Sequence, residues 1–353
     1  MTDIYQLLAR HLDRLPAGLP ATETGVELRI LKRLFTAEEA RIAMGLTMML
    51  EPVSAIARRL GVEAKDLQPA LDQMSRKGLI FRSTKQGQTL YMAAQFVVGI
   101  WEYHVNDLDE ELIKDFNEYV PHLIQRSWVE RKTKQLRVIP VSASIRADMQ
   151  VMPYEEAEEI IRRQSKIVVA PCICRREHRM AGAGCDKPME VCLLFGSGAY
   201  FYEQNGLGRP VSSDEALTIL DRAMEAGLVL QPGNAQKPSN ICMCCGCCCQ
   251  ILKNLNNLEK PALAVDSNYY AEVNPAICNG CGVCETRCQM GAIELREIAR
   301  ILPERCIGCG LCIPTCEEQA IRLTAKDADR QIVPPKNLVD TYLQLARERG
   351  LIK

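Results

Sequence analysis

The sequence predicts a multidomain α+β protein, and the uneven distribution of its cysteines is the first reason. The chain has 353 residues, enough for two to four domains, and 18 of them are cysteines. None of these cysteines precedes Cys172, so the two halves of the chain differ in chemistry. Apolar residues at helical spacing fill much of the first half, while an alternating stretch from Ile80 and a short apolar run before Cys172 indicate strands.

The overall charge and the N-terminal sequence exclude several classes of protein. Lysine and arginine number 43 against 44 acidic residues, which leaves a net charge of −1 and no general attraction to nucleic acid or anionic membranes. The N-terminus lacks the pattern of a secretory signal, and the longest apolar stretches, such as residues 42–50, are too short to span a bilayer. We therefore expect a cytoplasmic protein without a membrane span, in which clustered cysteines bind metals rather than form disulfides.

Residues 1–93 are expected to form the first domain. Leu28, Leu31 and Leu34 fall at helical spacing, and further helices are expected over residues 38–50 and toward Gly78. A strand from Ile80, a turn and a returning strand complete the segment. This order resembles a winged helix-turn-helix domain preceded by an N-terminal helix.

The charge of this domain bears on whether it binds DNA. Residues 63–77, which correspond to the recognition helix, have a net charge of zero, and the wing adds only Arg82 and Lys85. A DNA reader needs a basic helix and wing. We therefore favour protein docking or homodimerisation through this domain, with DNA binding as the less favoured alternative.

The rest of the chain divides into four further segments. Residues 94–170 are expected to form a mostly helical connecting region, and residues 171–271 a cysteine-rich metal-binding part. Within that part, Ser212 and Glu215 have the spacing of a capping box at a helix start. Residues 272–325 carry a repeat, and residues 326–353 are expected to end in an amphipathic helix.

The repeat is the strongest signal in the sequence. Residues 278–288 and 306–316 both follow the pattern C-x2-C-x2-C-x3-C, and each cysteine of the second copy lies 28 residues after its counterpart. A cubane iron–sulfur cluster needs four thiolates at fixed separation, and cysteines two residues apart allow one tight loop to reach three of its corners. Glycines within both motifs permit those turns. A pair of zinc sites is the alternative.

Residues 272–325 resemble the bacterial-type ferredoxins that bind two [4Fe–4S] clusters. The resemblance implies that the fourth cysteine of each motif ligates the cluster of the other motif. It thus assigns one cluster to Cys278, Cys281, Cys284 and Cys316, and the second to Cys306, Cys309, Cys312 and Cys288. The family usually has a proline after the fourth cysteine, but here Gln289 and Glu317 stand at those positions.

A second cysteine-rich region precedes the repeat. Its ten cysteines are too many for inert core thiols, and they are expected to bind metal. They are Cys172, Cys174, Cys185, Cys192, Cys242, Cys244, Cys245, Cys247, Cys248 and Cys249. One or two additional iron–sulfur clusters are expected here, as cubanes or as an unusual cluster. The short stretch Cys244-Cys245-Gly246 is similar to the cluster-binding repeats of heterodisulfide reductases. Arg175 could offset the negative charge of a cluster, or be an ordinary solvated residue.

The chain as a whole resembles a group of iron–sulfur proteins from anaerobes that join these parts. The residues that carry the resemblance lie at 170–175, 184–188, 195–199 and 241–249. It implies an electron-transfer protein or subunit that exchanges electrons with a partner oxidoreductase, rather than a stand-alone enzyme. Two alternatives remain: a redox-responsive winged-helix regulator, and an oxidoreductase with a catalytic cluster in its middle domain. The glycine-rich stretch after Phe195 is expected to be a structural loop.

Overall fold

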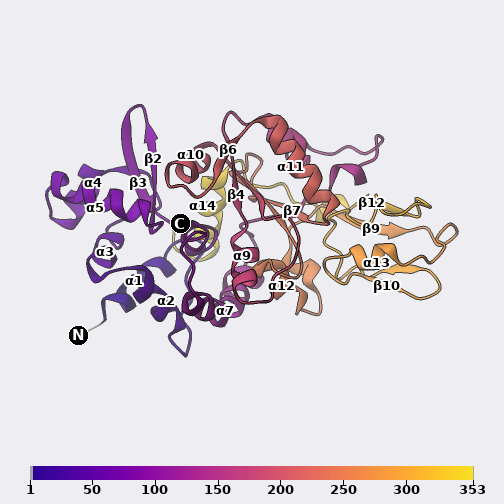
Figure 1. The fold of residues 1–353 in the computed structure, drawn as a ribbon, viewed down its shortest axis with the longest axis horizontal. Helices are drawn as coiled ribbons and strands as arrows, with labels where there is room; N and C mark the ends of the chain where they lie inside the picture. The colour runs from indigo at the N-terminus through magenta and orange to yellow at the C-terminus, as the bar shows by residue number, and fades with distance from the viewer. Residues whose placement is uncertain (1–2, 353) are drawn as a thin grey trace. The chain divides into compact units, whose positions relative to one another are not determined.

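The computed structural model describes residues 3–352 of the chain and contains two compact units. The first unit comprises the described residues of Met1–Thr133, Ser197–Arg209 and Tyr342–Lys353. The second comprises Lys134–Gly196 and Pro210–Thr341. Both contain helices and sheets, so the predicted multidomain α+β class is confirmed (Figure 1). The finer division into five segments stays a prediction.

The first unit is mainly helical and has one small sheet. Its helices are α1 (Ile4–Asp13), α2 (Val26–Leu34), α3 (Ala37–Ala43), α4 (Val53–Leu60), α5 (Ala64–Arg76), α6 (Trp101–Tyr103) and α7 (Glu110–Ile124), with most of α10 (Gly196–Gln204) and α14 (Leu338–Glu348). Its strands β1 (Glu51–Pro52), β2 (Ile80–Lys85) and β3 (Gln88–Ala93) form an antiparallel sheet in the order β1-β3-β2. The resemblance of these elements to a winged helix stays a prediction.

Two predicted elements of this unit differ in the structure. The helix expected over residues 38–50 is α3, which ends at Ala43. The chain turns there because Gly45 lies against Leu60, where a Cβ on the glycine would stand 2.6 Å from Cδ2 of the leucine. The prediction of a structural loop after Phe195 was wrong, since Gly196–Gln204 form helix α10. The aromatic ring of Phe201 in this helix is buried and stacks on Phe81 of β2, with ring centroids 4.8 Å apart.

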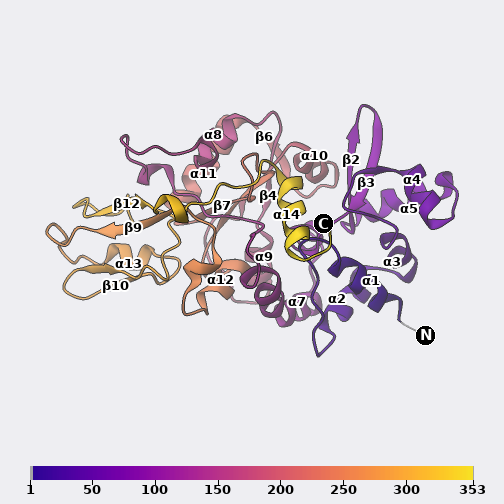
Figure 2. The same cartoon turned by 180° about the vertical axis from the view of Figure 1, so that it is seen from behind.

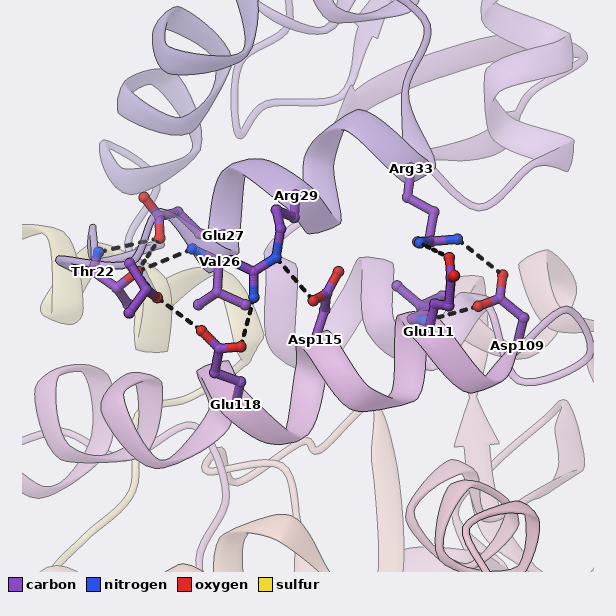
Figure 3. A network of polar contacts seen from close by, with 11 residues as sticks. Thr22, Val26, Glu27, Arg29, Arg33, Asp109, Glu111, Asp115 and Glu118 are labelled. Atoms are coloured by element: carbon purple, nitrogen blue, oxygen red, sulfur yellow. Dashed lines mark hydrogen bonds and ion pairs between the residues drawn. The ribbon is translucent and has the colours of Figure 1, made fainter.

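Ion pairs join α2 to α7 along the surface of the first unit (Figure 3). Arg29 contacts Asp115 at 3.0 Å and Glu118 at 2.6 Å, and Arg33 pairs with Glu111. These pairs are partly exposed, so each contributes little to stability. The buried aromatic contacts of the same helix matter more, because Phe116 of α7 stacks on Trp101 with ring centroids 3.5 Å apart.

The second unit is built on a five-stranded sheet in the order β6-β4-β5-β8-β7. Its helices are α8 (Ala157–Arg162), α9 (Ile173–Met180), α11 (Ser213–Glu225), α12 (Gln250–Asn256) and α13 (Val283–Arg287). Its strands are β4 (Ile167–Pro171), β5 (Glu190–Phe195), β6 (Arg209–Val211), β7 (Val229–Pro232), β8 (Asn240–Cys244), β9 (Tyr269–Val273), β10 (Ile293–Leu295), β11 (Ala299–Ile301) and β12 (Ile321–Ala325). Helix α11 packs on β4 and β5, and Ser212 caps it by accepting the N–H of Glu215 at 3.1 Å.

This sheet corrects one expectation about the middle of the chain. A mostly helical middle region was expected, yet the cysteine-rich part lies on β4, β5, β8 and β7. The strand predicted before Cys172 is β4, but the other strands were not expected, because they are short and β7 is buried along its whole length. A run of this kind has no alternating pattern, so it cannot be told from a buried helix by periodicity.

The repeat forms a separate region of the second unit, with two small sheets. Strands β10 and β11 form a hairpin, and β9 pairs antiparallel with β12 from Tyr269 opposite Ala325 to Val273 opposite Ile321. Figures 1 and 2 both show β9 and β12 side by side, next to α13 and β10. The chain therefore enters and leaves the repeat on neighbouring strands.

None of the helices within residues 3–352 has the length and apolar character needed to cross a bilayer.

Candidate metal centres

The cysteines of the repeat line two small cavities. The first cavity is lined by four of them, Cys278, Cys281, Cys284 and Cys316. The second cavity is lined by the other four, Cys288, Cys306, Cys309 and Cys312. The fourth cysteine of each motif thus lies at the cavity of the other motif. Four thiols around one cavity are the ligand set that a [4Fe–4S] cluster requires.

Backbone N–H groups point at the sulfurs of both cavities. In the first cavity, Sγ of Cys278 accepts from Ala299 at 3.5 Å, and Sγ of Cys316 accepts from Ala320 at 3.3 Å. The second cavity repeats the pattern, since Ala292 donates to Cys288 at 3.2 Å and Ala271 to Cys306 at 3.4 Å. Such donors stabilise thiolates and tune the potential of an iron–sulfur centre.

Tight turns bring the motif cysteines to the cavities. Gly308 has a φ of +68°, in the left-handed region, and a Cβ there would stand 2.1 Å from the carbonyl oxygen of Tyr269. Gly280 is the equivalent residue of the first motif, with a φ of +72° and the carbonyl oxygen of Glu297 only 2.3 Å from such a Cβ. Only glycine fits both the conformation and the space.

Burial raises the pKa of three thiols at the second cavity, Cys306, Cys309 and Cys312. It raises the pKa of Cys309 to about 12, and the neighbouring Cys288 and Cys306 add to the effect. The pKa of Cys312 is also raised, by burial and by the neighbouring thiols. Ligation must therefore displace protons, because only the thiolate binds metal.

The comparisons with known proteins match this region. Residues 299–322 match the 4Fe-4S binding domain family (Fer4). The 4Fe-4S binding segment includes the whole second motif and begins at β11. No curated protein and no solved structure matches the chain. The cysteine chemistry of the second motif is therefore that of an iron–sulfur protein, as predicted.

The ten cysteines that precede the repeat, at residues 172–249, separate into two groups. Six thiols are neighbours in a closed circuit, in which each lies close enough to two others to perturb their pKa values, in the order Cys172, Cys174, Cys249, Cys244, Cys242 and Cys192. We call this the six-thiol ring. A single tetrahedral ion takes only four ligands, so the ring has the size of a polynuclear centre.

The sheet and two helix starts position the six-thiol ring. Cys192 of β5 lies directly opposite Cys242 of β8, and Cys244 is two residues farther along β8, on the same face. Cys172 precedes α9 and Cys249 precedes α12 as N-cap residues. Pairing of strands that are distant in sequence thus gathers thiols that the sequence leaves far apart.

Buried side-chain amides also reach the six-thiol ring. Gln231 of β7 donates to Sγ of Cys249 at 3.8 Å, and Asn240 donates to Sγ of Cys242 at 3.5 Å. Both are buried polar residues that the sequence analysis missed. Only the β7–β8 register, which places Gln231 opposite Cys242, reveals this role for the glutamine.

The remaining four thiols form a second, tighter group. They are Cys185, Cys245, Cys247 and Cys248, and their sulfur atoms all lie within 4.8 Å of one another. We call this the four-thiol group. Cys185 comes from the loop between α9 and β5, and the other three come from the turn between β8 and α12. Cys244 and Cys245 therefore belong to different groups although they are adjacent in sequence.

Arg175 lies beside both groups and is almost fully buried, with 1% of its surface exposed. It donates to the carbonyl oxygen of Pro188 at 3.0 Å and to that of Met243 at 2.8 Å. Burial disfavours its charge, but thiolates of both groups, led by Cys172 and Cys245, raise the pKa of the guanidinium. Its Nε–H has no hydrogen-bond partner among residues 3–352. A buried cation with a spare donor fits a site that holds an anionic cluster.

A buried polar network joins the two helices that begin at the ring. Glu177 of α9 accepts a hydrogen bond from Gln250 of α12 and lies 3.2 Å from Nδ1 of His178. Nε2 of His178 in turn contacts Nζ of Lys253 at 2.9 Å. Burial raises the pKa of Glu177, and its hydrogen bonds to His178 and Gln250 oppose that effect. The network fixes the spacing of the helices and hence of the ring cysteines they carry.

Gln289, which replaces the usual proline of the ferredoxin family, contacts the four-thiol group. Its side-chain oxygen accepts the N–H of Gly246 at 2.9 Å, and Gly246 lies between Cys245 and Cys247. Asn256 donates to the backbone oxygen of Gln289, also at 2.9 Å. Gln289, the residue that departs from the family pattern, therefore links the second cavity to the cysteine-rich turn.

Proposed function

We propose that this protein transfers single electrons through two ferredoxin-type [4Fe–4S] clusters and one further iron–sulfur cluster in the six-thiol ring. The exchange of fourth cysteines between the two cavities is the observation that carries the proposal. A [4Fe–4S] cluster supplies one-electron redox chemistry when it is bound. The protein supplies the thiolates, the backbone donors and, at Arg175, a buried positive charge.

The contacts of Gln289 support a relay between the two cysteine-rich regions. This residue follows Cys288 of the second cavity and bonds to Gly246 beside the four-thiol group. Cys245 of that group directly follows Cys244 of the six-thiol ring. Covalent and hydrogen-bonded links therefore run without interruption from the second cavity to the ring.

We infer that a partner oxidoreductase exchanges electrons with the first cavity. Cys281 is the exposed member of the eight repeat cysteines. Cys316 borders a broad surface groove that Arg296, Arg300 and Arg322 also line. Glu272, Glu297 and Glu317 also line the groove, and Arg322 pairs with Glu272 at 2.9 Å, so the groove has mixed charge. An exposed ligand beside such a groove suits a protein that docks through complementary charges of both signs. All 18 cysteines are free thiols, which suits the reducing cytoplasm we propose as the location.

We infer that the winged-helix-like region docks proteins rather than DNA. Two of the five basic residues in the recognition helix and wing already have acidic partners, since Lys77 pairs with Glu39 at 2.6 Å and Arg82 contacts Asp72 at 3.5 Å. Phosphate contacts need free basic side chains. The stacking of Phe81 on Phe201 also shows that one face of β2 already packs against protein.

Two double variants, purified without oxygen, test the exchanged ligation. Cys281→Ser with Cys316→Ser removes two thiols from the first cavity, so we expect the loss of one cluster, about four irons and four sulfides. Cys281→Ser with Cys288→Ser removes one thiol from each cavity, so we expect both clusters to be lost or impaired. Iron and sulfide analysis with EPR of the reduced proteins measures both.

The two variants are matched because each replaces two cysteines and shares Cys281→Ser. Ligation within each motif would reverse the outcomes, because Cys281 and Cys288 belong to the same motif. That reversal, or a wild-type protein with far fewer than about eight irons per chain, would contradict the proposal.

A further inference from the structure

The four-thiol group differs from the two cavities in how closely its sulfur atoms approach one another. Sγ of Cys185 lies 3.6 Å from Sγ of Cys248 and 4.0 Å from Sγ of Cys245. Sγ of Cys247 lies 3.8 Å from that of Cys248. A tetrahedral Zn²⁺ ion, with Zn–S bonds of about 2.3 Å, holds its thiolates about 3.8 Å apart. The group therefore already has the spacing of ligands that share one ion.

The same spacing argues against a cubane at the four-thiol group. In a [4Fe–4S] cluster each thiolate binds a different iron, and bridging sulfides separate the irons. The thiolates must then lie much farther apart than ligands of a single ion. The repeat cavities agree with this, because within residues 3–352 no three repeat cysteines have sulfurs that all lie within 4.8 Å of one another.

We propose that the four-thiol group binds one Zn²⁺ ion in a closed tetrahedral site that contains no inorganic sulfide. Four protein thiolates leave no open position, which is typical of structural zinc sites. Zinc has no redox chemistry in proteins, so the ion would hold the structure and take no part in electron transfer. This inference goes beyond the proposed function, because it assigns these four cysteines to a structural role.

The position of the site explains what such an ion would hold together. Residues 181–189 form a loop between α9 and β5, while Cys245, Cys247 and Cys248 lie in a turn of the chain. One zinc ion would link the loop to the turn. Both segments are close in sequence to cysteines of the six-thiol ring, since Cys192 follows the loop and Cys249 follows Cys248. Arg175 lies close enough to Cys245 to offset part of the negative charge of a tetrathiolate site.

Metal and sulfide analysis of Cys247→Ser tests the proposal. Cys247 is the exposed member of the group, so its replacement disturbs packing least. We expect the wild-type protein to contain one zinc per chain. We expect Cys247→Ser to lose that zinc while the iron, sulfide and EPR signals of the two repeat clusters stay unchanged. The matched control is Cys281→Ser, which replaces the exposed cysteine of the first cavity and should lose iron and sulfide but keep the zinc.

Growth with cobalt in place of zinc provides a second readout that does not depend on the folding of a variant. We expect the visible absorption bands of tetrahedral Co²⁺ with thiolate ligands, and protection of Cys247 from alkylation until the cobalt is chelated. A wild-type protein without zinc, whose Cys247→Ser variant loses about four irons and four sulfides, would overturn the proposal in favour of a cubane. A wild-type protein without zinc, or one with a single iron at this site, would overturn the zinc assignment. None of these results depends on whether the two cavities exchange ligands.

Discussion

Replacement of Arg175 by methionine is expected to destabilise the second unit by about 3–5 kcal/mol. Methionine keeps much of the side-chain length but removes a buried charge and its two hydrogen bonds, to Pro188 and Met243. Met243 lies between two ring cysteines, so the loss loosens β8. Hydrogen exchange of the β8 amides in oxygen-free solution measures the local change in the free energy of opening.

The same variant should alter the redox centre of the six-thiol ring. The positive charge beside Cys172 favours the reduced, more negative state of a cluster, so its removal should lower the reduction potential. Arg179→Met is the control, because Arg179 lies on the same helix but is exposed, and its loss should change stability by about 0.5 kcal/mol or less. Equal behaviour of the two variants would show that Arg175 supports neither the fold nor a cluster.

Replacement of Gly246 by alanine is the second change with a large expected effect. A Cβ at Gly246 would stand 2.2 Å from the backbone oxygen of Gln289. That oxygen cannot rotate away, so we expect a loss of about 1–3 kcal/mol and a separation of the cysteine-rich turn from the repeat. Thermal unfolding in the absence of oxygen measures the stability, and the zinc content reports whether the turn keeps its shape.

Two controls separate steric strain from the lost hydrogen bond. Gly182→Ala meets no atom within 4 Å but has a φ of +71°, so it should cost only the backbone strain of about 1–2 kcal/mol and leave the metal content unchanged. Gln289→Ala removes the acceptor of the Gly246 N–H without a clash, and should cost about 1 kcal/mol. If Gly246→Ala keeps the metal content and thermal stability of the wild-type protein, the close approach of Gly246 to Gln289 is not needed for the structure of the turn.

The repeat shows how far local spacing can predict a site. The positions of its cysteines and glycines predicted a 4Fe-4S binding segment, and the match over residues 299–322 confirms that prediction. The spacing carries this information because one loop holds three of the four cysteines. The number of clusters and their ligands stay predictions, although the cysteines line the two cavities in the predicted combinations.

The ten cysteines at residues 172–249 show what the sequence alone could not predict. Their division into six and four depends on the pairing of β5 with β8, which are separated by more than forty residues. Strand β8 ends at Cys244, so the chain turns between this residue and Cys245 and sends their side chains to different groups. No local pattern predicts that turn. Arg175 was noted as a charge near cysteines, but its complete burial follows only from the fold.

Because β9 pairs with β12, the repeat can be exchanged as one segment, by evolution or in the laboratory. The five-residue ladder closes residues 274–320 into a loop whose two ends are already hydrogen-bonded to each other. A segment with adjoining ends can be exchanged for a related one of different length while its points of entry and exit stay in place. A graft would have to keep the contacts that the segment makes outside itself: Arg287 donates to Met224, Arg305 donates to Leu258, and Gln289 accepts the amide proton of Gly246, which a proline at that position could not do.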